Sequence, residues 1–196
     1  MKVGIFDHPA SGNIRSICNA ISFLGYDART VTQIDNIDCL IIPGVGTYLS
    51  GSIALSDYHK LIYEFSLEKP ILGICVGMQL LTQKGLEYGE SPGLNLIDGI
   101  CVKMNTKLRL PNIGWGLVTQ TKPSKLLEGI QDPHFYFMHS YEVINTDSCV
   151  AVSNYQAYEF AAIIESNKLF GVQFHPEKSR ESGLQLINNF LGICTK

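Results

Sequence analysis

A cysteine stands between two glycines in the segment Gly73-Ile74-Cys75-Val76-Gly77, within an apolar run that begins at Pro70. This glycine frame is typical of a sharp turn from a strand into a helix, because small neighbours are needed where the turn crowds the backbone. The turn would expose the cysteine at the carboxyl end of the strand, and the positive end of the helix would stabilise its thiolate form. Cys75 is therefore the candidate nucleophile, although cysteines in apolar runs are also common as core residues.

A thiolate that attacks an amide or ester needs a base that can also protonate the leaving group, and histidine is the usual choice. Of the five histidines, His175 lies at the end of the apolar run that begins at Gly171. Residues two apart in an extended segment point the same way, and Pro176 stiffens the pair, so Glu177 is placed to orient the imidazole. By itself, His-Pro-Glu would also suit a surface turn. Together, Cys75, His175 and Glu177 form a candidate catalytic triad.

The intermediate of such a reaction needs hydrogen-bond donors for its oxyanion. The amide of Val76, at the start of the predicted helix, is one candidate. The amide of Val45, in the turn Pro43-Gly44-Val45-Gly46, is the other. In a parallel sheet both amides lie at the carboxyl edge, where ligands bind. An ordinary tight turn explains the two glycines of the 43–46 segment about as well.

Strands that alternate with helices are expected to position these groups. Apolar runs predict strands at 2–6, 26–31, 38–42 and 70–74, and helical spacing predicts helices at 14–24, at about 52–67 and after Cys75. This alternation implies right-handed crossovers and a mostly parallel sheet. From about residue 96 the pattern changes to short strands at 97–103, 115–119, 134–138, 150–153, 160–164 and 169–174. Their closeness in sequence predicts antiparallel additions to the main sheet, before a last helix at about 181–191.

Composition argues against several classes of protein. The 15 basic and 18 acidic residues are scattered, which disfavours nucleic-acid binding, and 45% hydrophobic with 17% charged residues is typical of a globular chain. The apolar runs are far shorter than the roughly 20 residues that cross a bilayer, and the N-terminus lacks a signal-peptide pattern, so we expect a cytoplasmic protein. Six cysteines with no C-x-x-C pair argue against a disulfide framework or a structural zinc site. We expect one domain over residues 1–196.

Three segments, in this order and over this length, resemble the class I (triad) glutamine amidotransferases. They are Pro43 to Gly46, Gly73 to Gln79 and Phe174 to Ser179. Further stretches resemble one branch of that family, the glutaminase subunits of imidazole glycerol phosphate synthase. These stretches are Ser11-Gly12-Asn13, Pro111-Asn112-Ile113-Gly114-Trp115, Phe137-Met138-His139-Ser140-Tyr141, Gly171-Val172-Gln173 and Asn189-Phe190-Leu191. The resemblance spans essentially the whole chain.

The resemblance implies an α/β, flavodoxin-like three-layer fold and a glutaminase that needs no cofactor or metal. Cys75 would attack the side-chain amide of L-glutamine, His175 would protonate the departing ammonia, and water would hydrolyse the thioester. The residues implied to line the glutamine pocket are Gly44, Gly46, Gln79, Ser140 and Tyr141. Asn13 and Lys178 would face a partner, a cyclase-type (β/α)8-barrel subunit that receives the ammonia in histidine biosynthesis. A solvated surface lysine is the alternative for Lys178.

The chain departs from the branch at His8 and Pro9, at Asn112 in place of a histidine, and at Val76 in place of a common leucine. None of these departures touches the triad. His8, Pro9 and Asn112 lie in segments expected near the partner or the mouth of the site, so other partners stay open. The alternatives are a paralogous subunit that supplies ammonia for the amidination of a surface-polysaccharide sugar, a stand-alone cysteine hydrolase, and a non-catalytic interaction subunit.

Overall fold

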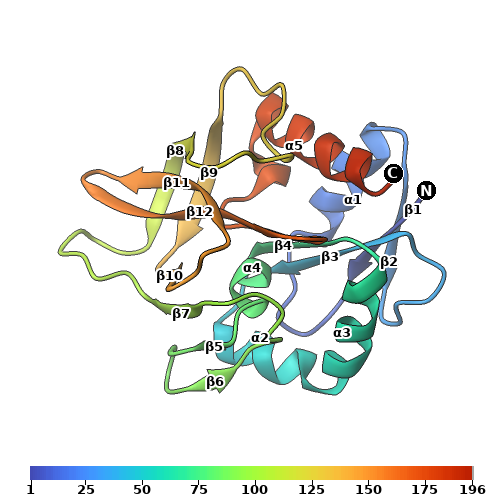
Figure 1. The fold of residues 1–196 in the computed structure, drawn as a ribbon, viewed down its shortest axis with the longest axis horizontal. Coiled ribbons are helices and arrows are strands. Elements are labelled where there is room, and N and C mark those ends of the chain that lie inside the picture. The colour runs from blue at the N-terminus through green and yellow to red at the C-terminus, as the bar shows by residue number, and fades with distance from the viewer. Residues whose placement is uncertain (196) are drawn as a thin grey trace.

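Five parallel strands form one half of a nine-stranded sheet in the computed structural model, which describes residues 1–195 (Figure 1). In spatial order they are β2 (Asp27–Val31), β1 (Lys2–Phe6), β3 (Cys39–Gly44), β4 (Ile71–Cys75) and β13 (Leu169–Val172). Strands β3, β4 and β13 are buried along their whole length, as expected where helices cover both faces of a parallel sheet.

Helices cover the two faces of this sheet and complete the expected three-layer α/β, flavodoxin-like fold (Figure 1). Helices α1 (Ile14–Phe23) and α5 (Arg180–Ile193) lie together on one face. Helices α2 (Tyr48–Leu55), α3 (His59–Glu68) and α4 (Val76–Leu80) lie on the other. Within residues 1–195, no helix has the length and apolar character needed to cross a membrane.

Antiparallel strands extend the sheet beyond β13, as the second half of the sequence predicts. Their order is β12 (Tyr158–Ser166), β11 (Cys149–Tyr155), β8 (Asn112–Gln120) and β9 (His134–His139). Strand β13 differs from the prediction because it is parallel to β4 and antiparallel only to β12. It therefore belongs to the parallel half, beside the strand that ends in Cys75.

The predicted strand at 97–103 does not join the main sheet. Its ordered part, β7 (Ile100–Lys103), lies in a separate four-stranded sheet with β10 (Tyr141–Ile144), β5 (Lys84–Gly85) and β6 (Ser91–Pro92). Gly99 precedes β7 with a positive φ of 132°, which interrupts an extended strand before residue 100. The local alternation predicts the strand, but its partner is set by pairing with residues about 40 positions later.

The predicted helix at about 52–67 begins earlier and is divided into two. Thr47 caps α2: its side chain accepts from the amide of Ser50 (3.1 Å), and the Ser50 hydroxyl accepts from the amide of Thr47 (3.1 Å). A single 3-10 turn, Ser56–Tyr58, separates α2 from α3. Helix α2 begins two residues after Gly46, so the cap at Thr47 fixes where the 43–46 turn ends.

Helix α4 packs so closely on β3 and β4 that side chains are excluded at the glycines beside Cys75. A Cβ on Gly77 would lie 1.8 Å from the carbonyl oxygen of Ile42, and one on Gly73 would lie 2.6 Å from the carbonyl oxygen of Gly77. Between them, Cys75 adopts a left-handed φ of 56° with a ψ of −110°. This conformation is strained for a residue with a side chain, and the surrounding packing must hold it.

Gly77→Ala is expected to lower the free energy of unfolding by about 3 kcal/mol, because the new Cβ forces backbone atoms of β3 and α4 apart. Gly192→Ala is the matched control: a Cβ there meets no described atom within 4 Å, and alanine favours a helix by roughly 1 kcal/mol. Urea denaturation of both variants measures the difference. Equal free energies of unfolding for the two variants would show that the turn at Cys75 tolerates a side chain at position 77.

Candidate active site

Cys75 ends β4 and directly precedes α4, so its side chain lies at the carboxyl edge of the parallel strands. The residue is 4% exposed. Its Sγ lies 3.8 Å from the carbonyl oxygen of Met138 and 3.7 Å from Nε2 of Gln173. The sulfur is thus nearly shielded from bulk water at the edge of the core, with polar atoms within hydrogen-bonding reach.

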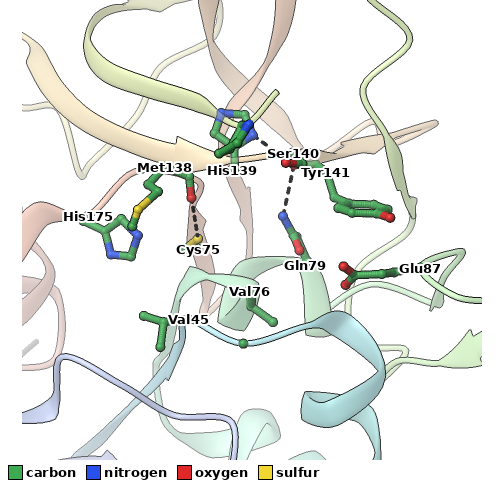
Figure 2. Close-up of a pocket in the computed structure, with 12 residues that line it drawn as sticks. Val45, Cys75, Val76, Gln79, Glu87, Met138, His139, Ser140, Tyr141 and His175 are labelled. Atoms are coloured by element: carbon green, nitrogen blue, oxygen red, sulfur yellow. Dashed lines mark hydrogen bonds between the residues drawn. The ribbon is translucent and has the colours of Figure 1, made fainter. Parts of the chain in front are cut away.

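His175 follows β13, the strand next to β4, and its side chain lies beside Cys75 in the same cavity (Figure 2). Its Nδ1 is 2.9 Å from Oε1 of Glu177, and the side chains of the pair are 3% and 0% exposed. The backbone amide of His175 donates to the carbonyl of Tyr136 (2.8 Å), and its carbonyl accepts from the hydroxyl of Ser179 (2.6 Å). These bonds fix the main chain that carries the imidazole.

The reason why His175 and Glu177 meet differs from the one that the sequence suggests. Only His175 is extended; Pro176–Lys178 form a 3-10 turn, η2, which folds the Glu177 carboxylate back onto the imidazole. The side chain of Asn13 donates to the same Oε1 of Glu177 (2.9 Å). The η2 turn and the hydrogen bond from Asn13, the N-cap residue of α1, therefore hold Glu177 against His175, and strand alternation does not.

Burial alone would lower the pKa of His175, but its hydrogen bonds and charge interactions with Cys75 and Glu177 raise that pKa from 6.5 to about 9. The imidazole is therefore suited to hold a proton taken from the thiol. His139 is the opposite case: burial, aided by the neighbouring His175, lowers its pKa to about 4, even though a hydrogen bond to the Tyr141 carbonyl raises that pKa. His139 is neutral at physiological pH.

A cavity of about 260 Å³ opens beside Cys75 and His175 (Figure 2). Among the residues predicted to line a substrate pocket, Gly46, Gln79, Ser140 and Tyr141 line this cavity, as do both residues assigned to the oxyanion donors, Val45 and Val76. Gly44 is not among the lining residues; a Cβ there would lie 2.7 Å from that of Val76, so its role is close packing under the site.

Four further lining residues are not among the predicted site residues, although three of them lie in stretches that carry the family resemblance and only Glu87 lies outside every motif. They are Glu87, Pro111, Met138 and His139. The Glu87 carboxylate faces the end of the cavity near Gln79 and Tyr141 (Figure 2), and it accepts from the amide of Tyr48 at 2.6 Å. Glu87 precedes a loop of no recognisable pattern, and only the pairing of β5 with β7 brings it here.

The two predicted oxyanion donors differ in availability. Val76 is the first residue of α4, where an amide has no partner within the helix. The amide of Val45 donates instead to the carbonyl of Ala10 (3.3 Å). His8 reinforces that arrangement, since its Nε2 lies 2.8 Å from the carbonyl oxygen of Pro43 and its Nδ1 accepts from the amide of Ala10. Donation by Val45 to a substrate would require the 43–46 turn to leave Ala10.

The residues predicted to face a partner lie beside the triad. Asn13 directs its side chain inward to Glu177, as described above. The Lys178 ammonium lies 6.0 Å from the centre of the Tyr136 ring on β9, and the Lys178 side chain is half-buried. Asn112, one of the departures from the family branch, is buried and bonds through Nδ2 to Nε2 of His139 (3.1 Å). It therefore acts inside the pocket wall rather than on the surface.

Comparison with known protein families identifies the family to which this chain belongs. The family model for "Glutamine amidotransferase class-I" matches residues 13–194. The chain is a member of the class I glutamine amidotransferase family. Relatives of this amidotransferase include a protein from Desulfitobacterium hafniense that is 39% identical, over 96% of this chain and 92% of the relative. Another, from Haemophilus influenzae, is 41% identical over 91% and 92%. Both are named imidazole glycerol phosphate synthase subunit HisH.

Solved structures share the fold of this amidotransferase. A structure described as a glutamine amidotransferase matches with a TM-score of 0.77 at 18% identity, over 99% of both chains. The structure of PurLQS from Thermotoga maritima matches with a TM-score of 0.78 at 18% identity, over 98% of both chains. At this identity the likeness concerns the architecture, and it agrees with the α/β fold described above.

Cys75→Ala is expected to return the pKa of His175 towards 6.5, because the thiol makes the first of the interactions that raise it. NMR titration of the imidazole measures this. The same shift makes stability depend on pH, because the pKa of His175 is about 9 in the folded state and 6.5 in the unfolded state. The charged imidazole stabilises the fold fully below about pH 6.5, and this contribution is lost as the pH rises through about 9. Cys18→Ala, on α1 and away from the cavity, is the control. An unchanged His175 titration in Cys75→Ala would contradict the pairing.

Proposed function

We propose that this amidotransferase is the glutaminase subunit of imidazole glycerol phosphate synthase. It would hydrolyse L-glutamine to glutamate and ammonia through Cys75, His175 and Glu177, and pass the ammonia to a cyclase-type (β/α)8-barrel subunit in histidine biosynthesis. The names of the relatives at 36–41% identity support the pathway. The observation that carries the proposal is the shared cavity of Cys75 and His175, with Nδ1 of His175 2.9 Å from Glu177.

The chemistry follows from the proton positions. Glu177 accepts the Nδ1 proton of His175, which leaves Nε2 to take the thiol proton of Cys75. The thiolate sulfur attacks the side-chain amide carbon of glutamine, and the carbonyl electrons move to oxygen, where the Val76 amide can donate. The imidazolium then protonates the amide nitrogen, which leaves as ammonia. His175 next removes a proton from water, and the resulting hydroxide releases glutamate from the thioester and regenerates Cys75.

The polar groups of the cavity suit an amino acid substrate. The Glu87 carboxylate at the far end from His175 complements an α-ammonium group. Gln79 uses Nε2 to donate to the carbonyl of Tyr141 (3.1 Å) and to Oε1 of Gln173 (3.0 Å), so its own Oε1 remains to accept from a ligand. A cavity of about 260 Å³ suits a small molecule. These features favour free glutamine over a polypeptide substrate.

An exposed apolar face next to the cavity supports the partner. Ile113, Trp115 and Leu117 alternate on β8, so they point to one side, and they are 57%, 49% and 49% exposed. Met138 on β9 adds to this face and also lines the cavity. The guanidinium of Arg180 lies 5.3 Å from the Trp115 ring. A contiguous apolar face with basic neighbours is typical of a protein interface, and a partner here would cover the route by which ammonia leaves.

The second candidate is a paralogous subunit that supplies ammonia for a surface-polysaccharide sugar. The observation that favours it is the pair of departures at His8 and Asn112. Both are buried and bonded into the walls of the site, His8 to the 43–46 turn and Asn112 to His139. The site is thus adapted to residues other than those of the family branch. The two candidates share the glutaminase step and differ in the barrel that receives the ammonia.

Two substitutions are expected to separate catalysis from docking. Cys75→Ala should abolish ammonia release from glutamine while leaving affinity for the cyclase subunit of imidazole glycerol phosphate synthase from the same organism unchanged. Trp115→Ala should weaken that affinity about tenfold or more, because a large aromatic side chain at an interface carries much of the binding energy. Ammonia release and isothermal titration calorimetry measure the two effects.

Phe23→Ala, which removes a 78% exposed aromatic at the end of α1, should change neither property. Hydrolysis of glutamine by Cys75→Ala at the wild-type rate would contradict the proposal that Cys75 is the nucleophile of a glutaminase. No binding of the wild-type chain to that cyclase subunit would overturn the histidine pathway and favour the paralogue.

A further inference from the structure

We propose that Gln173 stabilises the Cys75 thiolate by donating a hydrogen bond from its side-chain amide to the sulfur. This role rests on the proposed function in that Cys75 is taken as the nucleophile. Neither the His-Pro-Glu segment nor the glycine frame around Cys75 indicates it. Gln173 touches the reacting atom itself, so its effect would appear in the reactivity of the thiol and not merely in the stability of the fold.

The sheet register brings Gln173 to the sulfur. Strand β13 is parallel to β4, with Val172 opposite Ile74, so the next residue of each strand reaches the carboxyl edge together. There Nε2 of Gln173 lies 3.7 Å from Sγ of Cys75, and Gln173 is 0% exposed. The backbone amide of Gln173 donates to the carbonyl of Ala162 (2.9 Å), which ties the residue to β12 as well.

A chain of bonds from a backbone carbonyl fixes which end of the Gln173 amide faces the sulfur. The carbonyl oxygen of Tyr141 can only accept, so Gln79 must present Nε2 to it (Figure 2). The same Nε2 donates its second proton to Oε1 of Gln173 at 3.0 Å. Gln173 therefore turns its NH₂ group to Cys75. The reversed amide would set two donors against each other at Gln79 and an oxygen against the thiolate.

Ionisation of Cys75 makes this donor important. The thiol can donate to the carbonyl of Met138, at 3.8 Å, but the thiolate cannot, and a buried anion without donors is costly. Gln173 then shares the sulfur with His175. The other titratable groups around the thiol are His139, Glu87 and Tyr141 of the cavity wall and Cys101, whose pKa is raised by burial and then by Glu87 and Cys75. Gln173 is a neutral side chain, so it favours the thiolate at every pH.

The test is the pH dependence of alkylation of Cys75 by iodoacetamide, which transfers a carboxamidomethyl group to sulfur and releases iodide. Peptide mass spectrometry isolates the rate at Cys75 from the other cysteines. Gln173→Met keeps the volume and removes the donor; Gln173→Glu replaces the donor with a negative charge. We expect the midpoint to rise by about one pH unit for the methionine variant and by more for the glutamate variant. The rate at pH 7 should fall about tenfold or more.

Gln120→Glu is the matched control. Gln120 is exposed at the C-terminal end of β8, so this substitution should leave the pH midpoint of Cys75 alkylation unchanged. Circular dichroism and thermal melting identify the folded variants, and the methionine variant, which adds no buried charge, keeps the test available if the glutamate variant does not fold. A wild-type midpoint in folded Gln173→Met, or loss of stability with no shift, would overturn the role. Failure of the proposed function is separate, since it would appear as wild-type protein that is alkylated at Cys75 yet releases no ammonia.

Discussion

Direct backbone contact between the start of α4 and strands β3 and β4 is the constraint on which the site depends. The Ile42 carbonyl leaves no room for a Cβ on Gly77, and Cys75 takes a positive φ between the two glycines. The nucleophile is therefore held at the carboxyl edge by main-chain packing, which tertiary contacts on both sides of the sheet must maintain. The same approach places Val76, whose amide begins α4, in the cavity wall with Cys75. Strain at one residue thus positions two groups of the site.

Hydrogen-bond polarity organises the remaining groups around the sulfur. On one side, Asn13 and His175 both donate to Glu177, so the carboxylate orients the imidazole. On the other, the Tyr141 carbonyl accepts from Gln79 and from Nδ1 of the neutral His139. His175 faces Cys75 on the first side. On the second side Gln173, whose Oε1 accepts from Gln79, directs its Nε2 to the sulfur of Cys75. Because these bonds come from the segment after β13, from α4, β9 and β10 and from the N-terminal loop, the site is complete only when both halves of the chain have packed.

The parts predicted from the sequence are those that a local pattern specifies. Four of the five parallel strands, α1, α5 and the turn at Cys75 follow from apolar spacing and from the two glycines around the cysteine, whereas the direction of β13 depends on its pairing with β4. Glu87 and the separate sheet that contains β7 escape such analysis, because they depend on pairing between distant segments. The apolar pattern predicts the start of α2 too late, because the cap at Thr47 lies outside that pattern. The contact between Asn13 and Glu177 also escapes such analysis, because it joins residues 164 positions apart in sequence.

Covalent trapping of the nucleophile tests the central claim most directly. Burial raises the pKa values of the Cys101 and Cys149 thiols, so these remain neutral while Cys75 has donors on both sides. The full chain is treated with a glutamine analogue that carries an electrophilic carbon in place of the side-chain amide, and adducts are mapped by mass spectrometry. The account predicts a single adduct, on Cys75, that excess glutamine prevents. An adduct on another cysteine, or none on Cys75, would contradict it.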